Sequence, residues 1–169
     1  MEKKTYECAG RKGTLYCCEQ TDAPLIILNN YSDDGSSVIR AMEGIGTPDC
    51  NLLVIVNLRW DHDMTPWYCP PISENDTQYT GGADEYLDLL LTQFLPNCRT
   101  VLHGEPCFTG IAGYSLAGLF ALYAMYQCDI FDRVASMSGS LWFPGFKEYI
   151  LSHDLQKRPE KLYLSLGAR

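Results

Sequence analysis

Apolar residues along this chain form short continuous runs, and these runs alternate with segments of helical periodicity. Apolar runs of about four to eight residues, bounded by turn residues, are typical of strands buried on both faces of a parallel sheet. Such strands are predicted over residues 24–28, 51–58, 107–114, 133–140 and 161–167. The segments between them predict helices over residues 36–43, 83–98, 116–128 and 144–153.

The N-terminal segment has a different pattern. Residues 4–19, KTYECAGRKGTLYCCE, predict two short strands joined by a turn at residues 10–13, which together form a hairpin. Residues 59–82 are irregular and proline-rich, and loops of that length are often functional. Pro96 is expected to end the helix that begins at residue 83.

The order of these elements predicts the fold class. Strands that alternate with helices favour right-handed crossovers and a mostly parallel sheet with helices on both faces. The expected fold is therefore α/β, with the N-terminal hairpin supplying antiparallel strands at one edge. A chain of 169 residues suits one domain with a single core, so residues 1–169 are expected to form one domain.

Composition limits the kinds of partner that are expected for this protein. The formal net charge is −8, and the densest basic group, Lys3, Lys4, Arg11 and Lys12, is best interpreted as a solvated edge. A nucleic-acid partner is not expected, because such binding needs clustered basic residues. No apolar run is long enough to span a membrane, and no secretory signal follows the first charged residues. The eight cysteines lack any CxxC pair and are expected to be reduced, which favours the cytoplasm.

The segment IAGYSLAGLFALY, residues 111–123, carries the main chemical signal. A serine between a buried strand and an apolar helix, with small residues two before and two after it, matches a nucleophile elbow. Here those positions are Gly113 and Ala117, so Ser115 is the candidate nucleophile. The backbone N–H of Leu116 is one candidate oxyanion donor, and that of Tyr31, with Asn30 next, is the other. The alternative is a tight strand–helix joint without catalysis.

Several segments resemble one family. GYSLAGLFALY, NLRWDHDMTPW, TGGADEYLDLLLTQFLP, SGSLWF and LYLSLG together resemble the enterochelin esterase-like family of the α/β-hydrolase superfamily, over nearly the whole chain. The resemblance implies that Ser115 is the nucleophile and Leu116 an oxyanion donor. It also implies that Arg59, Trp60, Trp67 and Trp142 border the substrate pocket. Alternatively, the tryptophans only cover the sheet, and Arg59 is a solvated or structural cation.

The base that a serine nucleophile needs is not identifiable in this chain. In this superfamily the acid and the histidine follow the serine in that order. Ala168 and Arg169 stand where the resemblance implies an acid. His153 is expected at a solvated helix end, His62 matches no expected base position, and His103 is expected at the far end of the sheet. The fold is therefore expected to lack its last strand and helix. The chain is then either a truncated piece of a longer active protein or a natural inactive relative. In both cases an exposed sheet edge is expected to favour self-association.

The sequence thus predicts a serine hydrolase that acts on small carboxylic esters through an acyl-enzyme on Ser115. No cofactor or metal is expected, because there is no GxGxxG after the first parallel strand and no cluster of metal ligands. The alternative is a non-catalytic α/β-hydrolase-like module for binding or assembly. A cysteine-dependent enzyme is disfavoured, because no cysteine stands at an elbow.

Overall fold

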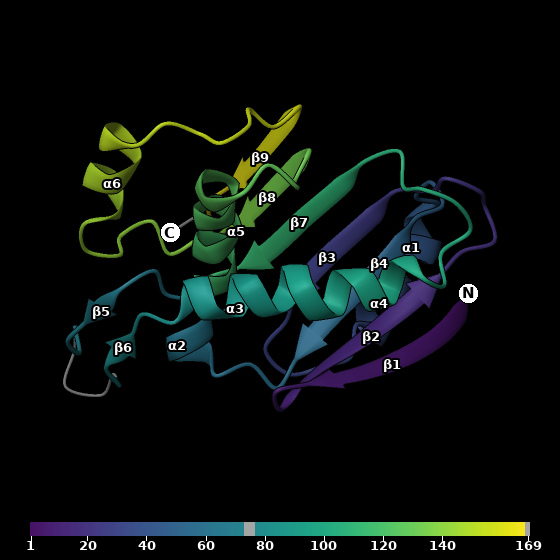
Figure 1. Cartoon of the computed structure of the whole chain (residues 1–169), viewed down its shortest axis with the longest axis horizontal. Coiled ribbons are helices and arrows are strands. Elements are labelled where there is room, and N and C mark those ends of the chain that lie inside the picture. Colours follow the sequence, from purple (N-terminus) through teal and green to yellow (C-terminus); the bar gives the residue numbers. More distant parts are fainter. Residues whose placement is uncertain (73–76, 168–169) are drawn as a thin grey trace.

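A seven-stranded sheet runs through the molecule (Figure 1). The computed structural model describes residues 1–72 and 77–167. The strand order is β1-β2-β4-β3-β7-β8-β9. The strands are β1 (Glu2–Cys8), β2 (Arg11–Cys17), β3 (Leu25–Asn29), β4 (Asn51–Val56), β7 (Thr109–Tyr114), β8 (Arg133–Met137) and β9 (Lys161–Ser165). β2 pairs antiparallel with both β1 and β4, and every other pairing in this sheet is parallel. The predicted α/β class and N-terminal hairpin are confirmed.

Helices cover both faces of the sheet, as predicted (Figure 1). One face carries α3 (Ala83–Leu89), a π-helical turn η1 (Leu90–Phe94), α4 (Leu95–Arg99) and α5 (Leu116–Gln127), and the other carries α1 (Ser36–Ile45). The remaining elements are α2 (Trp60–Asp63), β5 (Tyr68–Cys69), β6 (Tyr79–Thr80) and α6 (Phe146–Ser152). In its described residues, the 59–82 segment, expected to be irregular, therefore holds the short helix α2 and the ribbon of β5 and β6.

The alternation of side chains along β4 divides the core into two layers. Leu53 and Ile55 pack into the cluster that contains α5, whereas Leu52 and Val54 pack under α1. Successive side chains of a strand point to opposite faces, so a strand covered on both sides must be apolar throughout. Helix α5 is apolar around its whole circumference because it is buried along nearly its whole length.

The hairpin turn lies earlier than predicted. Only Ala9 and Gly10 form the turn, with φ of 49° and 78°, and Arg11, Lys12 and Gly13 already belong to β2. A two-residue hairpin with positive φ at both positions matches the right-handed twist of its strands. The Gly-Arg-Lys-Gly turn predicted at residues 10–13 is therefore wrong.

Pro96 does not end its helix, which continues to Arg99. In the π-helical turn ahead of the proline, the N–H of Leu95 bonds the carbonyl of Leu90, five residues back. Pro96 then falls in the first turn of α4, where its missing N–H costs little. The prediction failed because a π-helical turn can absorb a proline that an uninterrupted α-helix cannot.

β9 forms the edge of the sheet, and its side chains are largely exposed. Leu162, Tyr163 and Leu164 are exposed, and Tyr163 reaches 58% of its full exposure. Neither face of this strand is covered by a helix in the described part of the chain (Figure 1). β9 thus pairs with β8 on one side, and its other edge has no strand partner among residues 1–72 and 77–167.

Candidate active site

Ser115 lies between β7 and α5 in a strained backbone conformation. Its φ is 58° and its ψ is −122°, which non-glycine residues rarely adopt. Its N–H donates to Met137 of β8 at 3.1 Å. Its carbonyl accepts from the N–H groups of Gly118, Leu119 and Ser140 at 3.0, 3.1 and 3.0 Å. Neighbouring elements therefore hold the strained residue in place.

Small residues around Ser115 allow the strand and the helix to approach each other. A Cβ at Gly113 would lie 2.2 Å from the carbonyl oxygen of Ala117. A Cβ at Gly118 would lie 2.8 Å from Ser136 Oγ and 2.9 Å from Gly139 Cα. The backbone here has the close strand–helix packing of a nucleophile elbow.

The two residues predicted as oxyanion donors each follow a parallel strand, Tyr31 after β3 and Leu116 after β7 and Ser115. Leu116 is the first residue of α5, so its N–H has no partner within the helix. Tyr31 follows β3, whose last residue pairs with Gly113 of β7, and so lies at the same edge of the sheet as Ser115. The N–H of Asn30 donates to Ile55 at 2.9 Å, which removes Asn30 as a donor.

Ser115 Oγ contacts Ser140 Oγ at 3.3 Å, and within residues 1–72 and 77–167 no histidine hydrogen-bonds to it. His62 contacts Thr80 Oγ1 at 2.6 Å through Nδ1 and Glu85 at 3.5 Å through Nε2. His153 directly follows α6 and stacks on Tyr149, with ring centroids 4.1 Å apart. The predicted helix-end position of His153 is therefore confirmed.

Three side chains gather at the carboxyl ends of β3 and β4, and we call Tyr31, Arg59 and Trp60 the rim. The rings of Tyr31 and Trp60 meet edge to face at 5.2 Å. Tyr31 is 71% exposed, and the Arg59 side chain is 55% exposed. In parallel α/β sheets, ligands bind outside the carboxyl ends of the strands, which is where the rim and Ser115 lie.

The other two predicted pocket tryptophans differ in their surroundings. Trp142 is 57% exposed and packs against Tyr79 at 6.3 Å between ring centroids. Trp67 packs among aromatic rings, and its indole N–H donates to the Pro144 carbonyl at 2.9 Å. Its ring partners are Tyr123, Phe143, Phe146 and Tyr149. The Trp142 ring is therefore exposed to solvent, whereas Trp67 mainly joins the loop to α5 and α6.

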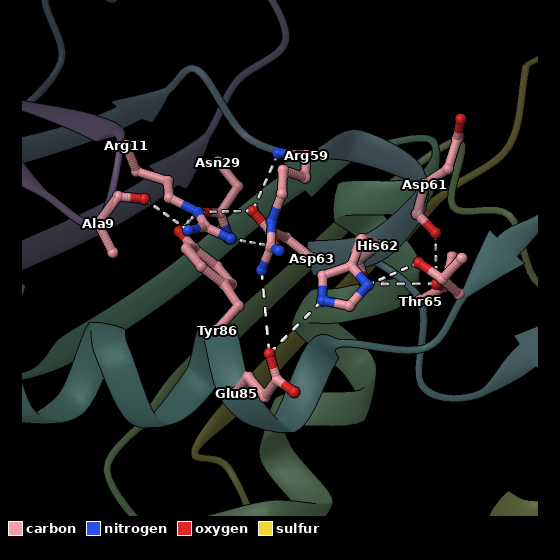
Figure 2. Close-up of polar contacts among 11 residues, drawn as sticks. Ala9, Arg11, Asn29, Arg59, Asp61, His62, Asp63, Thr65, Glu85 and Tyr86 are labelled. Atoms are coloured by element: carbon pink, nitrogen blue, oxygen red, sulfur yellow. Dashed lines mark hydrogen bonds and ion pairs between the residues drawn. The ribbon is translucent and has the colours of Figure 1, made fainter.

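A charged network below the rim was missed by sequence reasoning. Figure 2 shows Asp63 between Arg11 and Arg59, with Glu85 beyond the Arg59 guanidinium. Asp63 is fully buried, and Arg11 is nearly so. The hydrogen bonds that Arg11 donates to Asp63 raise the pKa of Arg11, although burial opposes this, and the guanidinium stays charged. The motif around Arg59 already contained Asp63, but nothing in the sequence linked it to Arg11, 52 residues away.

No candidate metal site appears within the described ranges, where no three His, Cys, Asp or Glu side chains are grouped to hold an ion. The eight cysteines are free thiols, and five of them are buried. Burial raises the pKa of Cys98 to about 12, so this thiol stays protonated at neutral pH. Of the helices described, none is long and apolar enough to cross a membrane.

Comparison with known families decides the identity of the fold. The chain matches the Esterase family model, described as "Putative esterase", over residues 51–161. The chain belongs to this esterase family. The matched span includes Arg59, Ser115 and Trp142, and the resemblance inferred from the sequence is confirmed.

Individual proteins resemble this esterase family member in sequence or in fold. An uncharacterized protein, YbbA, of Bacillus subtilis is 27% identical over 149 residues, covering 82% of this chain and 60% of the relative. An IroE-like serine hydrolase from Shewanella oneidensis superposes with a TM-score of 0.79 at 21% identity, over 96% of this chain and 59% of that one. The siderophore hydrolase EstA of Aspergillus nidulans gives a TM-score of 0.72 at 20% identity, over 99% and 69%. The chain thus spans about three fifths of the length of YbbA and of the Shewanella hydrolase.

Proposed function

We propose that this esterase family member is a serine hydrolase of carboxylic esters, with Ser115 as nucleophile. Ser115 Oγ attacks the ester carbonyl carbon, its proton passes to a base, and the alcohol leaves with a proton to give an acyl-enzyme. Water then attacks the acyl-enzyme, releasing the carboxylic acid and restoring the serine hydroxyl. The observation that carries the proposal is the strained backbone of Ser115 between β7 and α5.

The oxyanion of the tetrahedral intermediate is assigned to two backbone donors. The N–H of Leu116 stands at the positive end of α5, a helix of 12 residues. The N–H of Tyr31 is the second donor, since Asn30 is occupied by Ile55. Removing one such donor typically costs about 10²–10³-fold in turnover, so this pair would supply a large share of catalysis.

The substrate proposed is a small ester or lactone with an aromatic or apolar acyl part. The exposed rings of Tyr31 and Trp142 and the exposed Arg59 guanidinium support this choice. Solved relatives bear names that include siderophore hydrolase and enterobactin esterase, which are compatible with such a substrate. The net charge of −8 gives no reason to expect a polyanionic one.

The test is hydrolysis of a chromogenic short-chain ester by the chain and by the longest reading frame that contains it. Ser115→Ala is expected to abolish turnover, whereas Ser152→Ala, an exposed serine on α6, should leave it unchanged. Without a paired histidine, the turnover number is expected to fall about 10⁶-fold, so the longer frame is the more sensitive sample. Turnover that survives Ser115→Ala would contradict the proposal.

The alternative, a non-catalytic module for binding or assembly, is separated by the same assay. It requires that neither the chain nor the longer frame hydrolyses the ester. The cytoplasmic location and the single-domain organisation expected from the sequence stay predictions.

We also propose that the chain self-associates through β9. Two antiparallel β9 strands centred on Tyr163 would place Leu162 opposite Leu164 of the second copy, and Lys161 opposite Ser165. Exposed edge strands with apolar side chains favour such pairing, and this register keeps the two lysines apart.

A further inference from the structure

Asp63 is a buried carboxylate with four donor groups around it (Figure 2). Arg11 binds it through two nitrogens, Nη2 to Oδ1 at 2.6 Å and Nε to Oδ2 at 2.9 Å. Arg59 approaches it twice, with its backbone N–H at 3.0 Å from Oδ2 and its Nε at 3.3 Å from Oδ1. A single carboxylate therefore anchors both the backbone and the side chain of Arg59.

Arg11 brings the other half of this ion pair from the hairpin. Its third nitrogen, Nη1, donates to the Ala9 carbonyl at 2.6 Å, so the guanidinium is bonded on every side. A buried ion pair is costly to desolvate, and an apolar pair of similar volume often stabilises a fold as well or better. The stability of the fold therefore does not explain why this buried site holds charged side chains. The need to hold Arg59 in a fixed position does explain it.

A second contact in the same network reaches β3. Tyr86 of α3, buried beside Arg11, donates its hydroxyl to Asn29 Oδ1 (Figure 2). Burial, together with the Asp63 carboxylate, raises the pKa of Tyr86 well above its usual value, so the phenol remains a donor. Asn29 is the last residue of β3 and lies two residues before Tyr31. The network thus holds both segments that carry the rim.

We propose that the Arg11–Asp63 ion pair is a positioning device, which fixes α2 so that Arg59 and Trp60 meet Tyr31 beside Ser115. The inference rests on the proposed function in one respect, that the rim borders the substrate site. Asp63 and Arg11 are positioning residues, since Arg59 is exposed, Trp60 is partly exposed, and the ion pair itself is buried. Loss of the pair is expected to release α2 and separate the Trp60 and Tyr31 rings.

The test is ¹⁹F NMR of protein labelled with 5-fluorotryptophan, in which Trp60→Phe assigns one of three resonances. Asp63→Asn leaves Arg11 buried without its counter-charge, and Arg11→Met/Asp63→Leu replaces the pair by apolar side chains of similar volume. In both variants the Trp60 resonance is expected to shift by more than its linewidth or to broaden beyond detection. Trp67, packed between α5 and α6, reports whether the rest of the fold is intact.

Asp132→Asn is the matched control, because Asp132 also binds a cation and a backbone N–H, those of Lys157 and Thr109. It should leave the Trp60 resonance unchanged. A double variant with an unchanged Trp60 resonance would overturn the proposal. So would a double variant in which Trp67 also loses its native position, because the pair would then support the whole fold rather than the rim.

Ester hydrolysis separates this inference from the proposed function. Where the parent protein hydrolyses esters, the double variant should raise KM at least tenfold while Ser115 still reacts. A shifted Trp60 resonance in a protein without esterase activity would support the positioning role and count against the proposed function alone.

Discussion

At the scale of residues, Ser115 carries the most information. Its positive φ costs free energy, of the order of 1–3 kcal/mol for such conformations, and persists because neighbouring residues hold it. The Met137 carbonyl and three N–H groups from α5 and Ser140 fix its backbone. Strain of this kind at the junction of a strand and a helix is the reason for proposing a nucleophile here.

Gly113→Ala tests whether the close approach beside Ser115 is required. The added Cβ would meet the backbone of Ala117 at 2.2 Å, so the strand and helix must separate. The free energy of unfolding is expected to fall by about 3 kcal/mol in urea titrations. Gly44→Ala is the control, since a Cβ at this exposed site in α1 meets no atom within 4 Å and should raise the stability by about 0.5–1 kcal/mol. Equal effects of the two substitutions would contradict this view of the elbow.

The Lys3–Asp34 ion pair predicts a pH dependence of stability. The hydrogen bond from Lys3, with those from Ser36, lowers the pKa of Asp34 well below its usual value. Because the folded-state pKa is depressed, this stabilisation is present above the unfolded pKa of about 3.9 and is lost as the pH falls through the folded value. Asp34→Asn should lower the urea midpoint at pH 6, with the difference shrinking below about pH 4. A difference that grows in acid would contradict the assignment.

At the scale of elements, the strands were predictable because each parallel strand is a continuous apolar run bounded by turn residues. The strand–helix junction at Ser115 was predictable for a similar local reason, since Gly113, Ser115 and Ala117 are close in sequence. Features that depend on distant partners were not predictable. The Arg11–Asp63 pair joins β2 to α2, and the continuation of the helix through Pro96 depends on a π-helical turn. The residues next to Arg11 and Pro96 in the sequence indicate neither the ion pair nor the π-helical turn.

The hairpin turn offers a direct test at this scale. Ala9 holds a φ of 49°, which an alanine adopts at a cost, whereas asparagine is common at this turn position. Ala9→Asn is expected to raise the free energy of unfolding by about 0.5–1 kcal/mol, measured by urea titration. Gly10→Ala, at a φ of 78°, should lower it. If both substitutions destabilise the protein equally, the turn is not the two-residue type described.

At the scale of the whole molecule, the proposed self-association through the exposed edge of the sheet can be tested in solution. If two copies pair through β9, the apparent mass by light scattering should rise with concentration. Leu164→Lys places a charge opposite Leu162 of the second copy and should keep the protein monomeric. Leu151→Lys, an exposed leucine on α6, is the control and should leave association unchanged. Association that persists in Leu164→Lys would contradict pairing through this strand.

The proposed function links the fold to ester hydrolysis through one atom, Ser115 Oγ. The most direct measurement is intact-mass analysis after treatment with a fluorophosphonate, on the chain and on the longest reading frame that contains it. A single adduct is predicted in the parent and in Ser152→Ala, and none in Ser115→Ala. An adduct that persists in Ser115→Ala, or no adduct in either parent protein, would contradict Ser115 as the nucleophile.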